Sequence, residues 1–283
     1  MILDTKSLTV DTVKIVDAFA IRDFNNVDTE KFLAYEYEDK VARIFRKIKI
    51  SANNNKDIVD LSNNEYRLLF RFFVIMWRRN NIHVDKAREF GNQIENVIKS
   101  VYGEEGIKDI KKPEFRDVSH NDLFQKMQDK ISKPFYDKAI KETTDDDPTV
   151  QKTIKFYLPT IIYNKSTMHF SMHNTYATAQ YMMLNGDIEI SPDVLPISQV
   201  MPISSNLCLK LDLVDGNSEV DLTQEIFKIP IKILNDDNKI KKWIEEYATF
   251  NATHYIVDDT NVEVMKNIVE RKQKLKAKID ENA

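Results

Sequence analysis

The sequence predicts an α+β fold, with a helical N-terminal half packed on a mainly antiparallel sheet that two C-terminal helices close. Two observations carry this prediction. Apolar residues recur at helical spacing as far as about residue 143, and from residue 149 β-branched and aromatic residues come in short runs separated by turn signals. We expect a single domain over 1–283, with a helical half 1–146 and a sheet-rich half 147–283.

The first elements follow from local patterns. Residues 11–21 fit a short helix, although a strand is an open alternative. Asp28 can cap a helix over 29–48, and the polar residues 51–57 read as a loop. Ser62 and Glu65 form a capping box that opens a buried helix over 63–80.

Two further helices are expected over 85–102, ended by Gly103, and over 119–143, with a kink at Pro134. The acidic run at 143–148 is the best candidate for a boundary between the two halves.

The second half reads as strands and two closing helices. We expect strands near 154–163, 167–172, 178–184, 197–201, 206–213 and 226–233. Asn185-Gly186-Asp187 is the sharpest hairpin signal. Pro159, Pro202 and Pro230 favour bulges or sheet edges, because proline cannot donate to the ladder. The closing helices are expected over 235–247 and 261–279, with a short strand over 255–257 between them.

Composition narrows the function classes. The 41 basic and 45 acidic residues give a formal charge of −4, so no global attraction to nucleic acid or to an anionic membrane is expected. A local Arg/Lys face could still bind nucleic acid. The single cysteine, Cys208, excludes an internal disulfide and a cysteine-rich zinc site. No apolar run is long enough to span a bilayer. We expect a cytoplasmic protein without a cofactor or metal, and composition predicts no oligomeric state.

Few glycines, with abundant Lys, Asn, Asp and Ile, indicate an AT-rich gene of bacterial or phage origin. No Gly-rich phosphate loop, nucleophile elbow or zinc-protease helix motif is present.

Several segments occur in an order that resembles a large bacterial family known as a domain of unknown function. The resemblance covers about residues 30–260 and rests on YEYEDKVARIF (35–45), LSNNEYRLLFRFFVIMWRRN (61–80), FYLPTIIYNKSTMHFSMHNTYATAQ (156–180), MPISSNLCLKL (201–211) and ATFNATHYIVDD (248–259). The chain departs from the family pattern at two places. A His-Tyr-x-Pro segment is missing, and residues 172–176 replace the family's Thr-Ser-Asp-x-Pro turn. The resemblance implies a fold and no activity.

The densest cluster of candidate site residues lies in the run 156–184. His169 and His173 could supply a general base or a metal pair, with Asn174 and Tyr176 as hydrogen-bonding partners. The simpler alternative is hydrogen-bonded histidines at the end of a strand. Asn251 and His254 could converge with this turn at one end of the sheet, or they could cap a helix and begin a strand.

Arginines supply the second group of candidates. Arg67, Arg71, Arg78 and Arg79 could form a stripe that binds an oxyanion, and the alternative is an ordinary solvated helix face. Arg78 and His83 also match the spacing of the Arg-x4-6-His element, and so resemble the HEPN ribonucleases, in which both residues act on the scissile phosphate. The alternative is a chance match, because the pattern is short.

We therefore predict a binding or regulatory protein with a protein partner, in a setting such as phage–host conflict. The alternative is a hydrolase or ribonuclease that acts on a phosphodiester through Arg78, His83 or His173 with Asn174.

Overall fold

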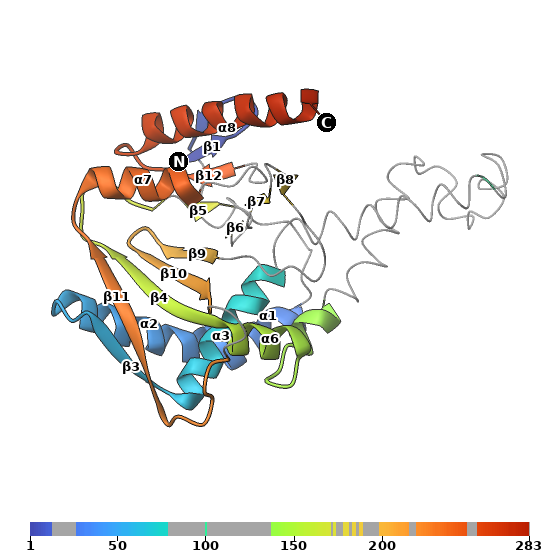
Figure 1. Ribbon diagram of the computed structural model, residues 1–283, viewed down its shortest axis with the longest axis vertical. Coiled ribbons are helices and arrows are strands. Elements are labelled where there is room, and N and C mark those ends of the chain that lie inside the picture. The colour runs from blue at the N-terminus through green and yellow to red at the C-terminus, as the bar shows by residue number, and fades with distance from the viewer. Residues whose placement is uncertain are drawn as a thin grey trace.

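A computed structural model describes residues 1–12, 27–78, 100, 137–170, 172–173, 178–180, 183–184, 187–188, 198–214, 219–247 and 254–282. The described part is the predicted α+β fold, with helices on both faces of a central sheet (Figure 1). Helices α1, α2, α3 and α6 lie on one face, and α7, α8 and a smaller sheet lie on the other side (Figure 1).

The central sheet has six strands in the order β3-β11-β4-β10-β9-β6. Their bounds are β3 (Ile58–Ser62), β4 (Tyr157–Asn164), β6 (Thr178–Gln180), β9 (Ser198–Ser204), β10 (Leu207–Leu213) and β11 (Ile226–Leu234). Only β11 and β4 pair in parallel, and the other neighbours are antiparallel, so the predicted mainly antiparallel sheet is confirmed.

A second sheet joins the two ends of the chain. Its strands are β1 (Ile2–Asp4), β2 (Val10–Asp11), β5 (Met172–His173) and β12 (His254–Ile256), in the order β2-β1-β12-β5. Strands β7 (Met183–Leu184) and β8 (Asp187–Ile188) form the hairpin that the Asn-Gly signal predicts. Because β1 and β3 come from the first 62 residues, the N-terminal half contributes strands to both larger sheets as well as helices.

The helices are close to the predicted positions in most cases. A continuous helical segment runs through α1 (Val27–Leu33), a π-helical stretch η2 (Ala34–Glu38) and α2 (Asp39–Asn53). α3 (Asn63–Arg78), α7 (Asp237–Tyr247) and α8 (Val262–Asn282) match their predictions within a few residues. The predicted helices over 85–102 and 119–143 lie mostly outside the described residues. Within these two ranges, residue 100 and residues 137–141 are described and are helical.

Three predictions about elements were wrong. The strand predicted near 154–163 begins only at Tyr157, because residues 148–156 form helix α6 (Pro148–Phe156), which Asp147 caps and whose first turn suits Pro148. Residues 167–170 are not a strand. The polar segment 51–57 is a loop only after Asn53, where α2 ends, and β3 begins soon afterwards at Ile58.

Two cores lie on opposite faces of the central sheet. The larger one packs α1, α2, α3 and α6 against one face, and includes Phe70, Phe73 and Tyr66, whose ring stacks on Phe227 with centroids 3.9 Å apart. The smaller one packs α7, α8 and β12 over one end of the other face, where Ile162 and Leu234 are buried. Along β3 and β11 the residues of this second face are exposed, and no described element covers them.

The prolines of the central sheet mark where one ladder ends. Asn164 N–H donates to the carbonyl of Asn206, so even-numbered residues of β4 direct their main-chain groups toward β10. Ile231 N–H donates to the carbonyl of Asp57, so odd-numbered residues of β11 direct theirs toward β3. Because the direction alternates along a strand, odd-numbered residues of β4 and even-numbered residues of β11 direct their main-chain groups toward each other. Pro159 and Pro230 therefore both lack an N–H on the β4–β11 side. The β4–β11 pairing begins directly after them, at Ile161 and Ile231.

The bulge or edge predicted at these two prolines is found only in part: β4 and β11 are interior strands without a register shift there, but both prolines precede the β4–β11 pairing. The predicted bulge is confirmed at Pro202, where the β9–β10 register shifts.

Candidate functional site

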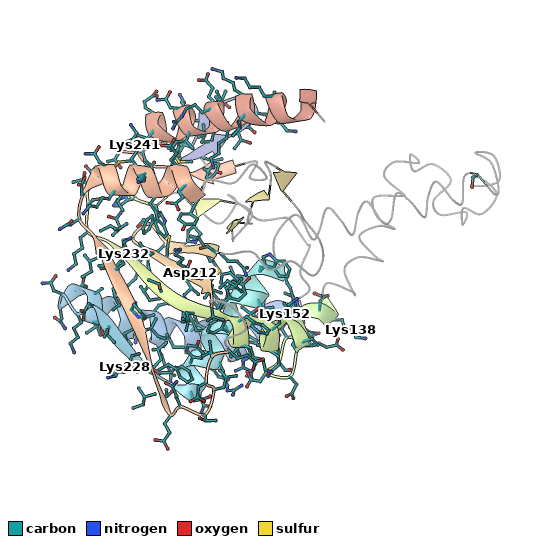
Figure 2. All side chains as sticks on the ribbon, viewed as in Figure 1. Lys138, Lys152, Asp212, Lys228, Lys232 and Lys241 are labelled. Atoms are coloured by element: carbon teal, nitrogen blue, oxygen red, sulfur yellow. The ribbon has the colours of Figure 1, made fainter. Side chains whose placement is uncertain are left out.

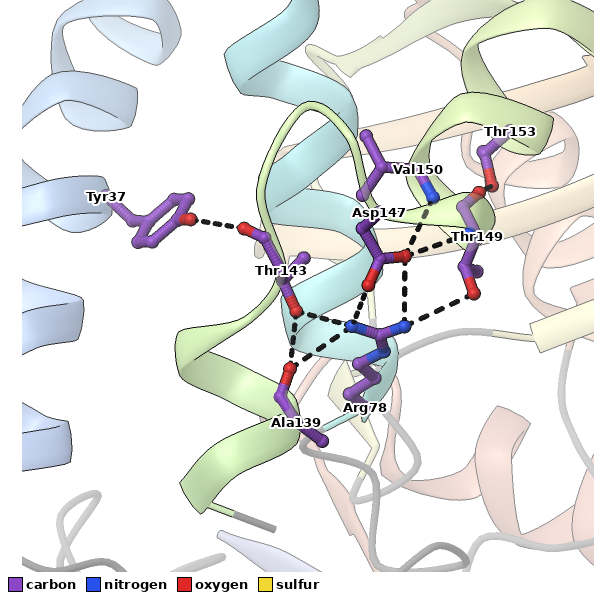
Figure 3. Close-up of polar contacts among 8 residues, drawn as sticks. All are labelled: Tyr37, Arg78, Ala139, Thr143, Asp147, Thr149, Val150 and Thr153. Atoms are coloured by element: carbon purple, nitrogen blue, oxygen red, sulfur yellow. Dashed lines mark hydrogen bonds and ion pairs between the residues drawn. The ribbon is translucent and has the colours of Figure 1, made fainter. Parts of the chain in front are cut away.

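Arg78 is the centre of the best-connected polar cluster among the described residues (Figure 3). It is the last residue of α3 and is mostly buried. Its Nη1 donates to Thr143 Oγ1 (2.6 Å), Asp147 Oδ2 (2.9 Å) and the carbonyl of Ala139 (3.2 Å). Its Nη2 donates to Asp147 Oδ1 (3.1 Å) and Thr149 Oγ1 (3.2 Å). The guanidinium thus holds the Asp147 carboxylate through two parallel hydrogen bonds.

Asp147 serves two elements at once. Its Oδ1 also accepts hydrogen bonds from the N–H groups of Thr149 and Val150, at 2.9 and 3.2 Å, and so caps α6. Burial alone would raise the pKa of Asp147, but the hydrogen bonds and charge of Arg78 and the two amides outweigh burial and hold this pKa below its ordinary value. The carboxylate is therefore ionised at neutral pH, and it links the end of α3 to the start of α6.

Arg71 makes a second tie to the same acidic run. Its Nε lies 3.1 Å from Asp145 Oδ1, although the two atoms are not aligned for a hydrogen bond, so the contact is electrostatic. The guanidinium also lies over the ring of Tyr37, at 5.6 Å from the centroid. Tyr37 in turn donates its hydroxyl hydrogen to the carbonyl of Thr143 at 2.6 Å.

The spacing of the arginines explains this arrangement. Residues 71 and 78 are seven positions apart and so lie two turns apart on one side of α3. The loop 143–147 lies against that side and gives one aspartate to each arginine. Arg67 is engaged within α3, where its Nε donates to Asn63 Oδ1 at 2.7 Å. An oxyanion could reach Arg78 only by displacing Asp147.

The acidic run at 143–148 thus connects helix α3 to helix α6. The predicted boundary at 143–148 separates the helical and sheet-rich parts of the chain in sequence, but Asp145 and Asp147 tie these parts together in space. His83 and Arg79, the predicted companions of Arg78, lie outside the described residues.

The second predicted site lies where β5 meets β12. These strands are antiparallel, with His173 opposite Tyr255, and His254 lies opposite Asp4 of β1. The structure therefore brings the segment around residue 173 next to the segment around residue 254. Only the backbone of His173 and His254 is described. Asn174, Tyr176 and Asn251 lie outside the described residues.

His169 gains a partner that the sequence did not indicate. Its Nδ1 is hydrogen bonded to Oδ2 of Asp258, which lies in the turn before α8. Asn261 supports the pair, because its side-chain amide donates to the carbonyl of His169 (3.1 Å) and its Oδ1 accepts from the N–H of Asp258 (2.9 Å). Burial would raise the pKa of Asp258, but hydrogen bonds from Thr260 and His169 outweigh it and hold this pKa below its ordinary value.

The loop that carries His169 is fastened on three sides. Asp237, at the start of α7, accepts hydrogen bonds from the Thr167 hydroxyl (2.7 Å) and the Met168 N–H (3.1 Å). Phe170 N–H donates to the carbonyl of Ser205 in the β9–β10 turn at 2.7 Å. Together with the Asp258 contact, these bonds position His169 at the junction of α7, α8 and the central sheet.

The His169–Asp258 pair has a defined chemical capacity. A carboxylate on Nδ1 favours the imidazole tautomer whose Nε2 can accept a proton. Within the part of the chain that the structure describes, no group of three His, Cys, Asp or Glu side chains could hold a metal ion. Cys208 is fully buried, and burial raises the pKa of its thiol, so it is not an available nucleophile.

The uncovered part of the central sheet offers a different kind of site. We call it the β3–β11 surface, and it consists of the exposed side chains Ile58, Asp60 and Ser62 on β3 and Ile226, Lys228, Pro230 and Lys232 on β11. These side chains share one face because they alternate with buried residues along both strands and pair across them, Ser62 with Ile226, Asp60 with Lys228 and Ile58 with Pro230.

The β3–β11 surface is partly apolar. Ile226 is 57% exposed and Ile58 is 44% exposed. Figure 2 shows Lys228 and Lys232 along β11 on this side of the molecule. The same face of β11 ends at Leu234, which is buried beside α7. The surface is therefore bounded at one end by α7 and open at the other.

Searches against family models, curated proteins and solved structures found no match to this chain. Among the described residues, no helix is both long enough and apolar enough to cross a membrane.

Proposed function

We propose that this chain is a binding or regulatory protein that recognises a protein partner through the β3–β11 surface. The observation that carries the proposal is the pair of exposed isoleucines, Ile58 and Ile226, on the part of a sheet face that none of the described helices covers. The two isoleucines lie at opposite ends of the β3–β11 pairing, with Asp60 and Lys228 between them. Such a mixture of exposed apolar and charged side chains is compatible with a protein–protein contact. Phage–host conflict, the expected setting of such a protein, belongs to the same proposal.

The arginine contacts support this choice over an anion site on α3. Arg71 and Arg78 already hold aspartates of the same chain, and Arg78 has both terminal nitrogens engaged. An incoming phosphate would have to compete with an intramolecular carboxylate that is already in bidentate geometry. By contrast, Lys228 and Lys232 are exposed and make no ion pair with any described residue.

Position-specific photo-crosslinking tests the proposal. A crosslinking amino acid replaces Lys228 in one variant and, as a matched control, Lys138, an exposed residue on another side of the molecule (Figure 2). In lysate of the native host, we expect position 228 to capture one protein that position 138 does not. We also expect Ile226→Asp to abolish that capture. Equal capture at both positions, or capture that survives Ile226→Asp, contradicts the proposal.

The His169–Asp258 pair favours a second candidate function, a hydrolase acting on a phosphodiester. In this alternative His169 is the general base that activates water, and Asp258 orients its ring. The test is turnover of single-stranded RNA and of bis(p-nitrophenyl) phosphate by the full chain. Activity that His169→Gln abolishes without a change in circular dichroism would support the candidate. No turnover by the wild-type chain would dismiss it.

A further inference from the structure

We infer that the free edge of β3 accepts an extended segment of the partner as an added strand, with a basic residue opposite Asp60 and an aliphatic residue opposite Ile58. This inference rests on the proposed function and specifies the chemistry of the partner. It follows from the direction of the main-chain groups of β3, the exposure of its side chains and its charge.

The register shows which groups of β3 are available. Ile231 N–H donates to the carbonyl of Asp57 at 2.7 Å, and Asn63 N–H donates to that of Glu225 at 3.0 Å. Odd-numbered residues of this segment therefore bond to β11, and the main-chain groups of Ile58 and Asp60 point the other way. β3 is the end strand of the sheet, and no hydrogen bond joins these two residues to another described element. Such an edge can extend a sheet by one strand.

Ser62 limits the length of the added strand. Its N–H donates to the Glu65 carboxylate at 2.8 Å, as part of the cap of α3. The acceptor site is therefore short and centred on Ile58 and Asp60. Specificity must then come from the side chains opposite these two residues.

Charge argues against a second copy of this chain as the occupant. In an antiparallel two-fold pairing centred on Asp60, the two Asp60 carboxylates would lie opposite each other. Shifting the register by two residues would place each carboxylate against Ile58 of the other copy. Like charges directly opposite are unfavourable, and neither register gives Asp60 a counter-ion. A pairing centred on Ile58 would set Asp60 opposite Lys56 of the other copy, but Lys56 lies outside β3 and its N–H already donates to the carbonyl of Ser51 at 3.0 Å.

The charge of Asp60 determines which residue an added strand should carry at the opposite position. Its side chain is exposed, it is the Cα partner of Lys228, and it forms no ion pair within the described residues. A charge on an edge strand discourages unselective strand pairing. It favours a strand that carries a basic residue at the opposite position, next to an aliphatic residue that packs on Ile58. The structure thus assigns an extended, basic and aliphatic peptide segment as the ligand.

Two synthetic peptides test this assignment on the full chain. Both are nine-residue peptides of alternating Thr and Val, with the central Val replaced by Lys in one and by Glu in the other. By fluorescence anisotropy we expect the Lys peptide to bind about three- to tenfold more tightly than the Glu peptide. Asp60→Lys should reverse the preference, and Asp60→Asn should abolish it. Amide exchange at Ile58 and Asp60 should slow when the Lys peptide binds.

The outcomes separate this inference from the proposed function. Failure of both peptides to bind at millimolar concentration, or a preference that Asp60→Lys leaves unchanged, overturns the added-strand assignment. The crosslink at position 228 would still report whether the β3–β11 surface binds a protein. If that crosslink also fails, the proposed function falls together with its extension.

Discussion

At the scale of single residues, Arg78 has the most consequential contacts in the described structure. Its guanidinium joins the end of α3 to the loop 143–147 and to the start of α6. These contacts are long-range in sequence, since Arg78 and Asp147 are 69 positions apart. The short spacing between Arg78 and His83 could be read from the sequence. The pairing of Arg78 with Asp147 could not, because many arginines and aspartates are equally compatible with it.

Arg78→Ala should lower the free energy of unfolding by about 2–4 kcal/mol, because it leaves a mostly buried carboxylate without its ion pair. Urea denaturation gives the value. Lys138→Ala, which breaks an exposed contact with Glu142, is the control and should change stability by less than about 0.5 kcal/mol. Similar small effects for both variants would show that the Arg78 cluster does not stabilise the fold.

Asp147 gives this cluster a pH dependence with a definite sign. Its pKa is lower in the folded state than its ordinary value of 3.8. Its contribution is therefore complete above the unfolded pKa, near pH 4, and is lost as the pH falls through the lower folded value. Between about pH 5 and pH 2 the wild-type chain should lose more unfolding free energy than Asp147→Asn. Parallel pH profiles for the two chains would contradict the stated direction of the shift.

Tyr66 makes an unusual contribution to the core. Its ring stacks on Phe227, but its buried hydroxyl has no hydrogen-bond partner among the described residues. Tyr66→Phe removes an unpaired polar group and should leave stability unchanged or raise it by up to about 1 kcal/mol. Tyr37→Phe removes a hydroxyl that donates to Thr143 and should cost about 1 kcal/mol. A larger loss for Tyr66→Phe than for Tyr37→Phe, both measured by urea denaturation, would contradict this reading.

At the scale of elements, local signals predicted the starts of helices and the turns well. Ser62 N–H donates to Glu65, and Glu65 N–H donates to Ser62 Oγ at 3.3 Å, so the capping box forms as expected. The start of α6 has a comparable signal, Asp147 followed by Pro148. The acidic residues around it led instead to the prediction of a boundary between the two halves of the chain. β3 was missed because its five residues lie between a polar loop and a strong helix start.

The cap at Ser62 can be tested directly. Ser62→Ala should reduce the free energy of unfolding by about 1 kcal/mol, because it leaves the Glu65 N–H without its side-chain acceptor. Ser62→Asp retains a capping oxygen and should stay within about 0.5 kcal/mol of the wild type. Thermal or urea denaturation of the three chains distinguishes the cap from a general effect of changing residue 62.

At the scale of the whole molecule, the order of strands is what the sequence could not supply. The pattern of β-branched runs predicted most strands of the central sheet and its mainly antiparallel character. It could not show that β11 lies between β3 and β4, or that β1 pairs with β12 across most of the chain. These pairings create the exposed β3–β11 surface and bring His169 into contact with Asp258. Both features depend on which strands are neighbours, and the local pattern of apolar and polar residues does not show that.

We propose above that the β3–β11 surface binds a protein. It is tested most directly by comparing two exposed aliphatic residues, Ile226 on β11 and Leu275 on α8, which are 57% and 52% exposed. Binding of the partner captured at position 228 is measured by titration calorimetry. Ile226→Asp should weaken it by about 2 kcal/mol or more, roughly thirtyfold, and Leu275→Asp should leave it unchanged. Equal effects of the two substitutions, or full affinity of the Ile226→Asp chain, would contradict the claim.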